Sequence, residues 1–379
     1  MKPNYKLSNL DILPTLFLTL TPVTAVVLTV WYIMSGNFSW WSIVLFGVFY
    51  TITAMSITGG YHRLFSHKSY EASTFVRLMY ALFGAAAFQN SILKWATDHR
   101  IHHRFVDSDK DPYSIKKGFL YAHIGWMLFK EEQHPHYKAY QRDLVNDKIV
   151  MWQDKYYVPI AIFMGLILPG LLGLWIFNSF LGGLALGGFM RLVCVHHGTF
   201  LINSLSHWWG KQTYTDQNSA KDNLFAAFLT FGEGYHNFHH LFANDYRNGI
   251  RWYHWDPTKW LIKFKAKLGL VYSLRKAPEE EILKAKLLMD EKRLAQKTSV
   301  DHYAHWQIHL EDLKARLLEA QTKINALKKE YVKLKAEKTQ DYKRRMDEIK
   351  RQWQKEKSEW LISYKIWRLT LKRAMLSFA

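Results

Sequence analysis

The sequence predicts an all-α integral membrane protein. It would have four transmembrane helices in two hairpins, a cytosolic cap of helices holding a histidine-rich metal site, and C-terminal coiled-coil helices. Three observations predict this fold: paired apolar runs, eight histidines in three clusters, and a last hundred residues without glycine or proline. We expect a membrane domain with its cap over residues 1–278 and a helical coiled-coil extension over residues 279–379.

Four apolar runs have the length of membrane spans. They cover residues 10–34, 41–58, 157–177 and 179–198. Their charged residues are Asp11 and Arg191. A transmembrane helix needs about 20 predominantly apolar residues. The first run is too long for a signal-peptide core and leads directly into the second, so we expect residue 1 to stay in the mature chain.

The distribution of lysine and arginine predicts the orientation of the spans. The short turns at residues 35–40 and 178–179 contain neither residue type, whereas residues 60–156 and everything after 199 are rich in both. Cytosolic loops of membrane proteins carry this excess of positive charge. We therefore expect both termini and all the histidine clusters on the cytosolic side.

Residues 75–93 are apolar but contain Arg77, Gln89 and Asn90. A complete span here would put the first and second histidine clusters on opposite sides of the membrane. An interfacial or re-entrant helix keeps them on the same side, and we expect that arrangement.

The histidine clusters indicate a metal centre. They are His62 and His67; His99, His102 and His103; and His236, His239 and His240. In the second and third clusters the offsets of three and four residues place all three rings on one helix face, aimed at a common point. The first pair is five residues apart, about 140° around a regular helix, so we expect a helix end or a distortion there.

Eight imidazoles are the number of ligands that two metal ions would need. Imidazole suits zinc, copper, iron or nickel, and a structural zinc site takes four ligands in a small domain. Iron used for oxygen activation fits better, so we expect two Fe²⁺ ions with O₂ as co-substrate. The single cysteine, Cys194, excludes a disulfide framework and a cysteine-ligated iron–sulfur cluster in this chain.

Five segments within residues 10–265 resemble the membrane-bound fatty acid desaturases, specifically the Δ9 acyl-CoA (stearoyl-CoA type) branch. They are "GGYHRLFSH", "WATDHRIHHRF", "KDPYSIKKGFLYAHIGWML", "NSLSHWWG" and "GEGYHNFHHLFANDYR". The resemblance implies a ninth histidine ligand, His207, and a metal-bound water held by Asn203. It also implies that a cis double bond, expected at Δ9, is introduced into a long saturated acyl thioester, most often acyl-CoA.

The same resemblance implies a dry, bent substrate tunnel beside the metals. The matching positions are Gln89, Trp95 and Thr199 at the bend, Tyr50 and Ala54 at the blind end, and Asn90, Asp98 and Lys130 at the thioester head. Thr97 and Glu131 stand where animal members carry basic residues. Because fewer cations would weaken binding of the coenzyme A phosphates, an acyl carrier protein thioester or a lipid-linked acyl chain is an alternative substrate.

Two further readings of the same scaffold also stay open: a membrane hydroxylase or other oxygenase, and a noncatalytic assembly factor. The intact histidine clusters argue against the second. The chain shows no His-Pro-Gly-Gly haem loop, cysteine cluster or glycine-rich dinucleotide fingerprint. We therefore expect a separate electron donor: ferredoxin, rubredoxin or cytochrome b5 with its reductase. We expect a multi-pass protein of a bacterial inner membrane, in contact with membrane lipid, and no nucleic-acid partner.

The C-terminal extension has a composition of its own, with 24 Lys and Arg against 16 Asp and Glu in residues 279–379. A heptad-like seam runs through Leu310, Leu313, Leu317, Ala320, Ile324, Leu327, Tyr331 and Leu334. It predicts a coiled coil over residues 310–334 with another copy, another protein or a helix of the same tail.

The end of this extension has an aromatic side. Trp360, Tyr364 and Trp367 share a helix face with Leu371, opposite several lysines and arginines. We expect this face to lie on the membrane surface, with a solvated charged helix as the alternative.

Overall fold

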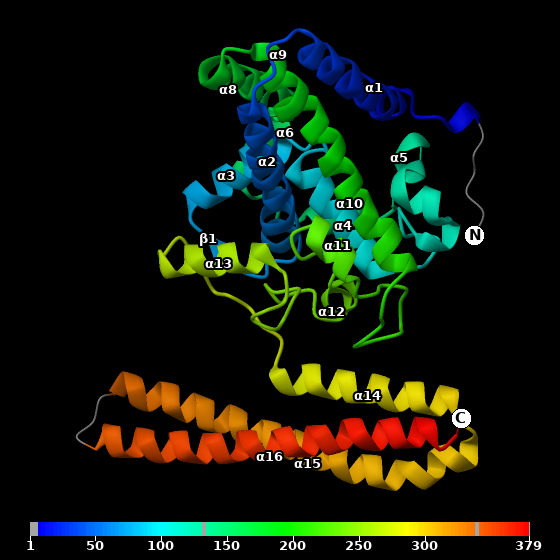
Figure 1. The fold of residues 1–379 in the computed structure, drawn as a ribbon, viewed down its shortest axis with the longest axis vertical. Coiled ribbons are helices and arrows are strands. Elements are labelled where there is room, and N and C mark those ends of the chain that lie inside the picture. The colour runs from blue at the N-terminus through cyan, green and yellow to red at the C-terminus, as the bar shows by residue number, and fades with distance from the viewer. Residues whose placement is uncertain (1–6, 131–133, 338–340, 379) are drawn as a thin grey trace. The chain divides into compact units, whose positions relative to one another are not determined.

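A computed structural model describes residues 7–130, 134–337 and 341–378 (Figure 1). The chain forms two compact units: residues up to 212 with 217–276, and residues 213–216 with 277 onward. Helices dominate both, which confirms the predicted all-α class. The strands among the described residues are β1 (Glu71–Ala72) and β2 (Val271–Tyr272), which pair antiparallel.

Four helices of the first unit are long and apolar enough to cross a membrane. They are α1 (Ile12–Met34); α2 (Trp40–Met55) with the π-helix Ser56–Ser66; α7 (Tyr157–Ile162), the π-helix Phe163–Ile167 and α8 (Leu168–Phe177); and α9 (Phe180–Gly182), the π-helix Gly183–Met190 and α10 (Arg191–Trp208). The second and fourth spans run further than predicted, to Ser66 and Trp208. These extensions carry His62 and His207.

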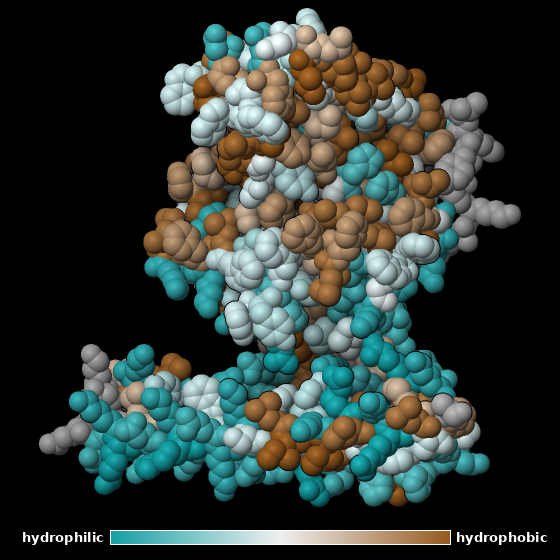
Figure 2. Space-filling model, in the orientation of Figure 1, coloured by the Kyte–Doolittle hydropathy of each residue, from teal (hydrophilic) through white to brown (hydrophobic). Residues whose placement is uncertain are grey.

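The outer surface of these helices suits lipid rather than water. Leu13 is 78% exposed and Trp175 is 82% exposed. Figure 2 shows hydrophobic residues over much of this part of the molecule. Water disfavours so large an apolar surface, whereas acyl chains accept it. The chain is therefore a membrane protein.

The remaining helices of the first unit form the cap and its supports. They are α3 (Thr74–Ala85), α4 (Ile92–Phe105), α5 (Trp126–Leu128), α6 (Lys148–Lys155), α11 (Leu224–Leu229), α12 (His236–Leu241) and α13 (Pro257–Lys267), with 3-10 turns at Leu7–Asn9, Ile115–Lys117 and Tyr137–Gln141 and a π-helical turn at Tyr121–Gly125. Polar caps set where several of them begin: the Ser91 hydroxyl accepts from the Lys94 amide, and the Asp256 carboxylate from the Lys259 amide.

The apolar stretch 75–93 is not a span. Helix α3 has 12 residues and rises about 18 Å, too little to cross a hydrocarbon core of about 30 Å. The chain then turns back into α4 through Phe88 and Asn90, which have positive φ angles of 52° and 73°. This geometry agrees with the expected interfacial or re-entrant helix.

Arg191, the one charge inside the fourth run, is completely buried. Its guanidinium donates to the carbonyl oxygens of Ala86 at 2.6 Å, Gly165 at 2.5 Å and Gly187 at 3.0 Å. Gly165 and Gly187 lie in π-helical segments, and Ala86 begins the turn before α4. One side chain thus joins two spans to the support of the cap.

The second unit contains α14 (Glu279–Lys297), α15 (Val300–Glu337) and α16 (Tyr342–Leu376). Helices α15 and α16 lie side by side (Figure 1). Buried residues from all three form one core: Leu283, Leu287, Leu294, Leu310, Leu317, Trp367, Leu371 and Ala374.

The burial of the predicted seam residues shows which partner the seam has. Leu310, Leu317, Ile324 and Leu334 are buried and the other seam positions are half-buried. Of the three expected partners, the structure supplies a helix of the same tail; pairing with another copy or protein stays a prediction. The expectation that the aromatic face of α16 meets a membrane is wrong. Trp367 is fully buried, and Trp360 and Tyr364 pack against the same core.

Replacing Arg191 by Met should destabilise the first unit by about 2–3 kcal/mol, because three carbonyl oxygens lose a charged donor inside the membrane domain. The loss is measured as a lower thermal unfolding temperature in detergent. Arg104→Met, at an exposed position, is the matched control and should change the temperature little. Equal unfolding temperatures for the two variants would contradict the structural role of Arg191.

Candidate metal centre

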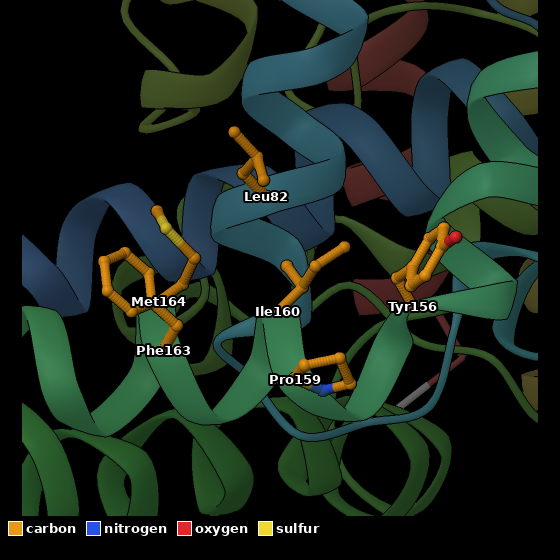
Figure 3. A pocket seen from close by; sticks show the side chains of 6 residues that line it. All are labelled: Leu82, Tyr156, Pro159, Ile160, Phe163 and Met164. Atoms are coloured by element: carbon orange, nitrogen blue, oxygen red, sulfur yellow. The ribbon is translucent and has the colours of Figure 1, made fainter.

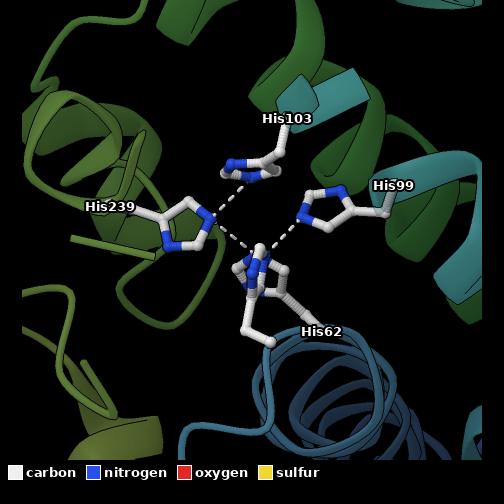
Figure 4. Close-up of side chains that lie close together, drawn as sticks. His62, His99, His103 and His239 are labelled. Carbon is white, nitrogen blue, oxygen red and sulfur yellow. Dashed lines mark hydrogen bonds between the residues drawn. The ribbon is translucent and has the colours of Figure 1, made fainter. Parts of the chain in front are cut away.

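Nine histidines of the first unit converge in two groups. The first holds His62, His67, His99, His103 and His239; the second holds His102, His207, His236 and His240. Within each group the ligand nitrogens lie within 4.8 Å of one another. Figure 4 shows the rings of four members of the first group turned toward one another. All nine histidines predicted as ligands are thus brought together.

A π-helix positions the first histidine pair. Residues Ser56–Ser66 form this segment, and His67 follows it directly. The wider turn of a π-helix joins residues five apart, as in the hydrogen bond from the His67 amide to the His62 carbonyl at 3.1 Å. The two ring centroids consequently lie 4.8 Å apart. This is the helix distortion that the spacing predicts.

The expectation that each HxxHH cluster aims at one point is wrong. Helix α4 directs His99 and His103 to the first group and His102 to the second. Helix α12 does the converse, with His239 in the first group and its neighbours His236 and His240 in the second. Residues four apart differ by about 40° around a helix, whereas the third histidine lies about 60° or more away. Each helix therefore serves both groups.

The donor set fits metal ions. The Nε2 atoms of His62 and His239 lie 2.9 Å apart, and those of His207 and His236 lie 3.0 Å apart. Two imidazole nitrogens bound at right angles to one ion, each about 2.1 Å from it, would be separated by about 3 Å. In addition, Nε2 of His102 is buried and has no hydrogen-bond partner among the described residues. An ion in each group would satisfy these nitrogens.

Burial keeps six of these rings uncharged. It lowers the pKa of His67, His99, His103, His239 and His240 well below the usual value, and neighbouring histidines lower it further. The pKa of His236 falls to about 3 for the same reasons. At neutral pH their nitrogen lone pairs are therefore free to bind a metal.

Carboxylates behind the rings fix the orientation of two histidines. The His62 Nδ1 lies 2.8 Å from Glu233, and the His102 Nδ1 lies 2.8 Å from Asp111. Arg63 pairs with Glu233 at 2.9 Å. Burial alone would raise the pKa of Glu233, but the charges and hydrogen bonds of His62 and Arg63 lower it to about 2. A carboxylate on the far nitrogen selects the tautomer whose Nε2 faces the metal.

His207 has a longer relay of the same kind. Its Nδ1 lies 2.8 Å from the Ser219 hydroxyl, which donates to Asp107 at 2.6 Å. Sequence reasoning missed these supporting residues. The signal for Glu233 and Asp111 was their place inside "GEGYHNFHH" and "KDPYS"; Ser219 and Asp107 had none. Asn203 lies one turn before His207 on α10, on the same face; its hold on a water stays a prediction.

The three residues expected at the tunnel bend form one network. The Gln89 amide donates to the Thr199 hydroxyl at 3.0 Å, and the Trp95 indole donates to Gln89 at 3.3 Å. The Trp95 ring also stacks on His99 with centroids 5.0 Å apart. The bend residues therefore adjoin the first histidine group.

The two residues expected at the blind end lie on α2. Tyr50 and Ala54 are one turn apart, so both can face the same side of the helix. The Tyr50 hydroxyl donates to the Leu229 carbonyl at 2.9 Å, which fixes the ring.

The residues expected at the thioester head are less closely connected. The backbone amide of Asn90 donates to Tyr157 at 3.0 Å, and Asp98 binds Lys94 at 2.9 Å and Tyr137 at 2.8 Å. Lys130 is exposed, and in the described part of the chain no ion pair joins it to Asp98. Thr97 is buried, and Glu131 lies outside the described residues.

An apolar pocket of about 470 Å³ lies between α3 and the third span (Figure 3). Its lining residues are Leu82, Tyr156, Pro159, Ile160, Phe163 and Met164. None of the expected tunnel residues takes part. This lining suits a surface that meets acyl chains of the bilayer.

Comparison with known proteins gives consistent relatives. The model of the family described as "Fatty acid desaturase" matches residues 38–274. The chain is 44% identical over 266 residues to a probable acyl-CoA desaturase of Schizosaccharomyces pombe, covering 70% of this chain and 55% of that protein. It is 42% identical over 259 residues to acyl-CoA desaturase 1 of Saccharomyces cerevisiae, covering 68% and 50%.

A third relative is the stearoyl-CoA desaturase of Homo sapiens, 37% identical over 247 residues, which cover 63% of this chain and 68% of that protein. The chain spans about half the length of the two yeast relatives. These organisms give no support to a bacterial inner membrane. The matched residues contain all nine clustered histidines. The chain belongs to the fatty acid desaturase family.

Proposed function

We propose that this chain is a di-iron, O₂-dependent desaturase that introduces a cis double bond, at Δ9, into a long saturated acyl-CoA. The observation that carries the proposal is the convergence of nine histidines, seven of them buried, in two groups within a chain of this family. Three relatives named above are called acyl-CoA or stearoyl-CoA desaturases, which supports the acyl-CoA thioester as substrate.

The nine histidines would hold two Fe²⁺ ions, five ligands in one group and four in the other, with Asn203 binding through a water. When bound, the ions supply the redox chemistry by which O₂ accepts two hydrogens from adjacent carbons and two external electrons with two protons, giving an alkene and two waters. The chain's residues position this chemistry. Glu233 and Asp111 orient His62 and His102, and burial keeps bulk water away.

The acyl chain would lie in a bent tunnel beside the histidines. The network of Gln89, Trp95 and Thr199 would define the bend, because it joins two elements and stacks on His99. Tyr50 and Ala54 would close the far end and so set the accepted length. Asn90, Asp98 and Lys130 would contact the head group. A flexible chain held in this way presents one pair of carbons to the reacting centre.

Electrons would come from a separate ferredoxin, rubredoxin or cytochrome b5 with its reductase, drawn to a chain of net charge +19. We place both termini and the histidine groups on the cytosolic side, because lysine and arginine concentrate there. Residues 1–278 would form the catalytic membrane domain and residues 279–379 a separate helical domain. An acyl carrier protein thioester or a lipid-linked acyl chain is the alternative substrate, and hydroxylation is the alternative reaction.

Expression in a host cell should add a monounsaturated fatty acid with a Δ9 cis double bond, detected by gas chromatography and mass spectrometry. His102→Ala should lower this product at least 100-fold, because it removes a ligand whose Nε2 has no hydrogen-bond partner among the described residues. His136→Ala, at an exposed histidine outside both groups, is the control and should leave the product unchanged. A hydroxy acid in place of the alkene would favour the hydroxylase.

Ala54→Trp should shorten the preferred acyl chain by several carbons, because the larger ring would fill the blind end of the tunnel. Val48→Trp, on an exposed position of the same helix, should leave the product lengths as they are. The readout is the chain-length distribution of the monounsaturated products. An unchanged chain-length distribution in Ala54→Trp would contradict the placement of Ala54 at the blind end of the tunnel.

The metal-stripped protein should lose stability as the pH falls. Six of the clustered histidines, which are His67, His99, His103, His236, His239 and His240, have folded pKa values below the unfolded value of about 6.5, that of His236 being about 3. Their contribution is therefore complete above about pH 6.5 and is lost progressively between about pH 6.5 and 3, because the unfolded chain binds more protons. Thermal unfolding in detergent at pH 7.5, 6 and 5 measures the effect. A constant unfolding temperature would argue against uncharged histidines.

A further inference from the structure

The second half of α16 exposes an apolar stripe. Ile362 is 60% exposed, Ile366 44%, Leu369 49% and Leu376 65%. Offsets of four, three and seven residues put these four side chains on one face of the helix. We call this set the α16 stripe. Figure 2 shows hydrophobic residues on the unit formed by α14, α15 and α16, among mainly hydrophilic ones.

The α16 stripe has no part in holding the three helices together. That role belongs to another face of α16, where Trp367 and Leu371 are buried and Trp360 and Tyr364 pack against the core. Apolar side chains that do not serve a core and stay in contact with water mark an interaction surface.

The charges around the stripe are all of one sign. No aspartate or glutamate follows Glu359. The cations in that stretch are Lys365, Arg368, Lys372 and Arg373, and all four are exposed. Among the described residues, no ion pair joins any of them to a carboxylate. Lys365 and Lys372 lie along one edge of the stripe and Arg373 lies within it, so an occupant of the stripe must accept positive charge.

We propose that the α16 stripe lies on an anionic lipid surface, with its four apolar side chains at the boundary between headgroups and acyl chains. The four cations would lie at the level of the lipid phosphates. An apolar helix face bordered by lysine and arginine is the composition that binds such surfaces. The spans of the same chain keep a bilayer within reach, which raises the effective concentration of lipid around the tail.

Other occupants fit the surface less well. A second copy placed stripe to stripe would bring eight cations together without a carboxylate from either copy after Glu359. Like charges in apposition oppose such a contact. A stable contact with another protein buries about 800 Å² on each partner, from 20–30 residues. The stripe is one helix wide and contains four apolar residues, whereas a lipid interface accepts a single helix.

The test uses the full chain in lipid nanodiscs with Cys194→Ser as background. A nitroxide label is attached at Leu369→Cys on the stripe or at Thr322→Cys, an exposed position of α15. The discs contain phosphatidylcholine alone or with about 30% phosphatidylserine. Accessibility of each label is measured to O₂, which partitions into lipid, and to a water-soluble nickel complex.

In anionic discs the label at position 369 should be more accessible to O₂ than to nickel, and the label at 322 the reverse. In phosphatidylcholine alone, position 369 should become accessible to nickel. Replacing all four cations by Gln should have the same effect in anionic discs, because each cation contributes roughly fivefold to the ratio of bound to free tail. Circular dichroism checks that this variant keeps its helices.

Two results would overturn the proposal. One is a label at position 369 as accessible to nickel as the label at 322 in anionic discs. The other is a pair of 369 labels closer than about 30 Å in pulsed dipolar spectroscopy of two chains, which would assign the stripe to a second copy.

Discussion

The structure depends on the close packing of uncharged imidazole rings. Two ring nitrogens about 3 Å apart, as in His62 and His239, stabilise each other only when a proton or a metal ion lies between their lone pairs. Burial lowers the pKa of rings such as His67 and His239 and so keeps them uncharged, and the spacing of the nitrogens in each group suits one ion. The surrounding helices must therefore bring nine histidines from distant segments to two points. The fold of the first unit brings these histidines together.

Three devices in the first unit meet this requirement. The π-helix before His67 turns two residues that are five apart toward one group. Helices α4 and α12 each supply both groups, which holds the groups at a set separation. Buried carboxylates, Glu233 and Asp111, bind the outer nitrogens of two rings and keep their inner nitrogens directed into the two histidine groups. The π-helix departs from regular α-helical geometry and the carboxylates are buried away from water, and in both cases the result is a fixed position of the histidine rings.

The membrane spans support this arrangement as well as crossing the bilayer. A lone buried arginine is costly in lipid unless several acceptors surround it. Arg191 meets three backbone carbonyls, two of them in π-helical segments, and thereby ties the turn before α4 to two spans. The C-terminal residues form a second compact unit. It has a core of its own, and the face of α16 that this core leaves free carries a different combination of apolar and basic residues.

The sequence by itself determined the all-α class, the four long apolar helices, eight of the nine clustered histidines and the helical tail, whereas His207 followed from the family resemblance. Residue type and the spacing of histidines and apolar residues along the chain predict these features. The length of each apolar run reflects the thickness of a bilayer. Only the tertiary structure decided how the histidines divide. His99 and His102 are three residues apart yet serve different groups, while His62 meets His239 from 177 residues away. It also decided the partners of Arg191, the roles of Glu233 and Ser219, and which face of α16 is buried. Such choices depend on how helices distant in the chain approach and rotate against one another, and no local pattern records that rotation.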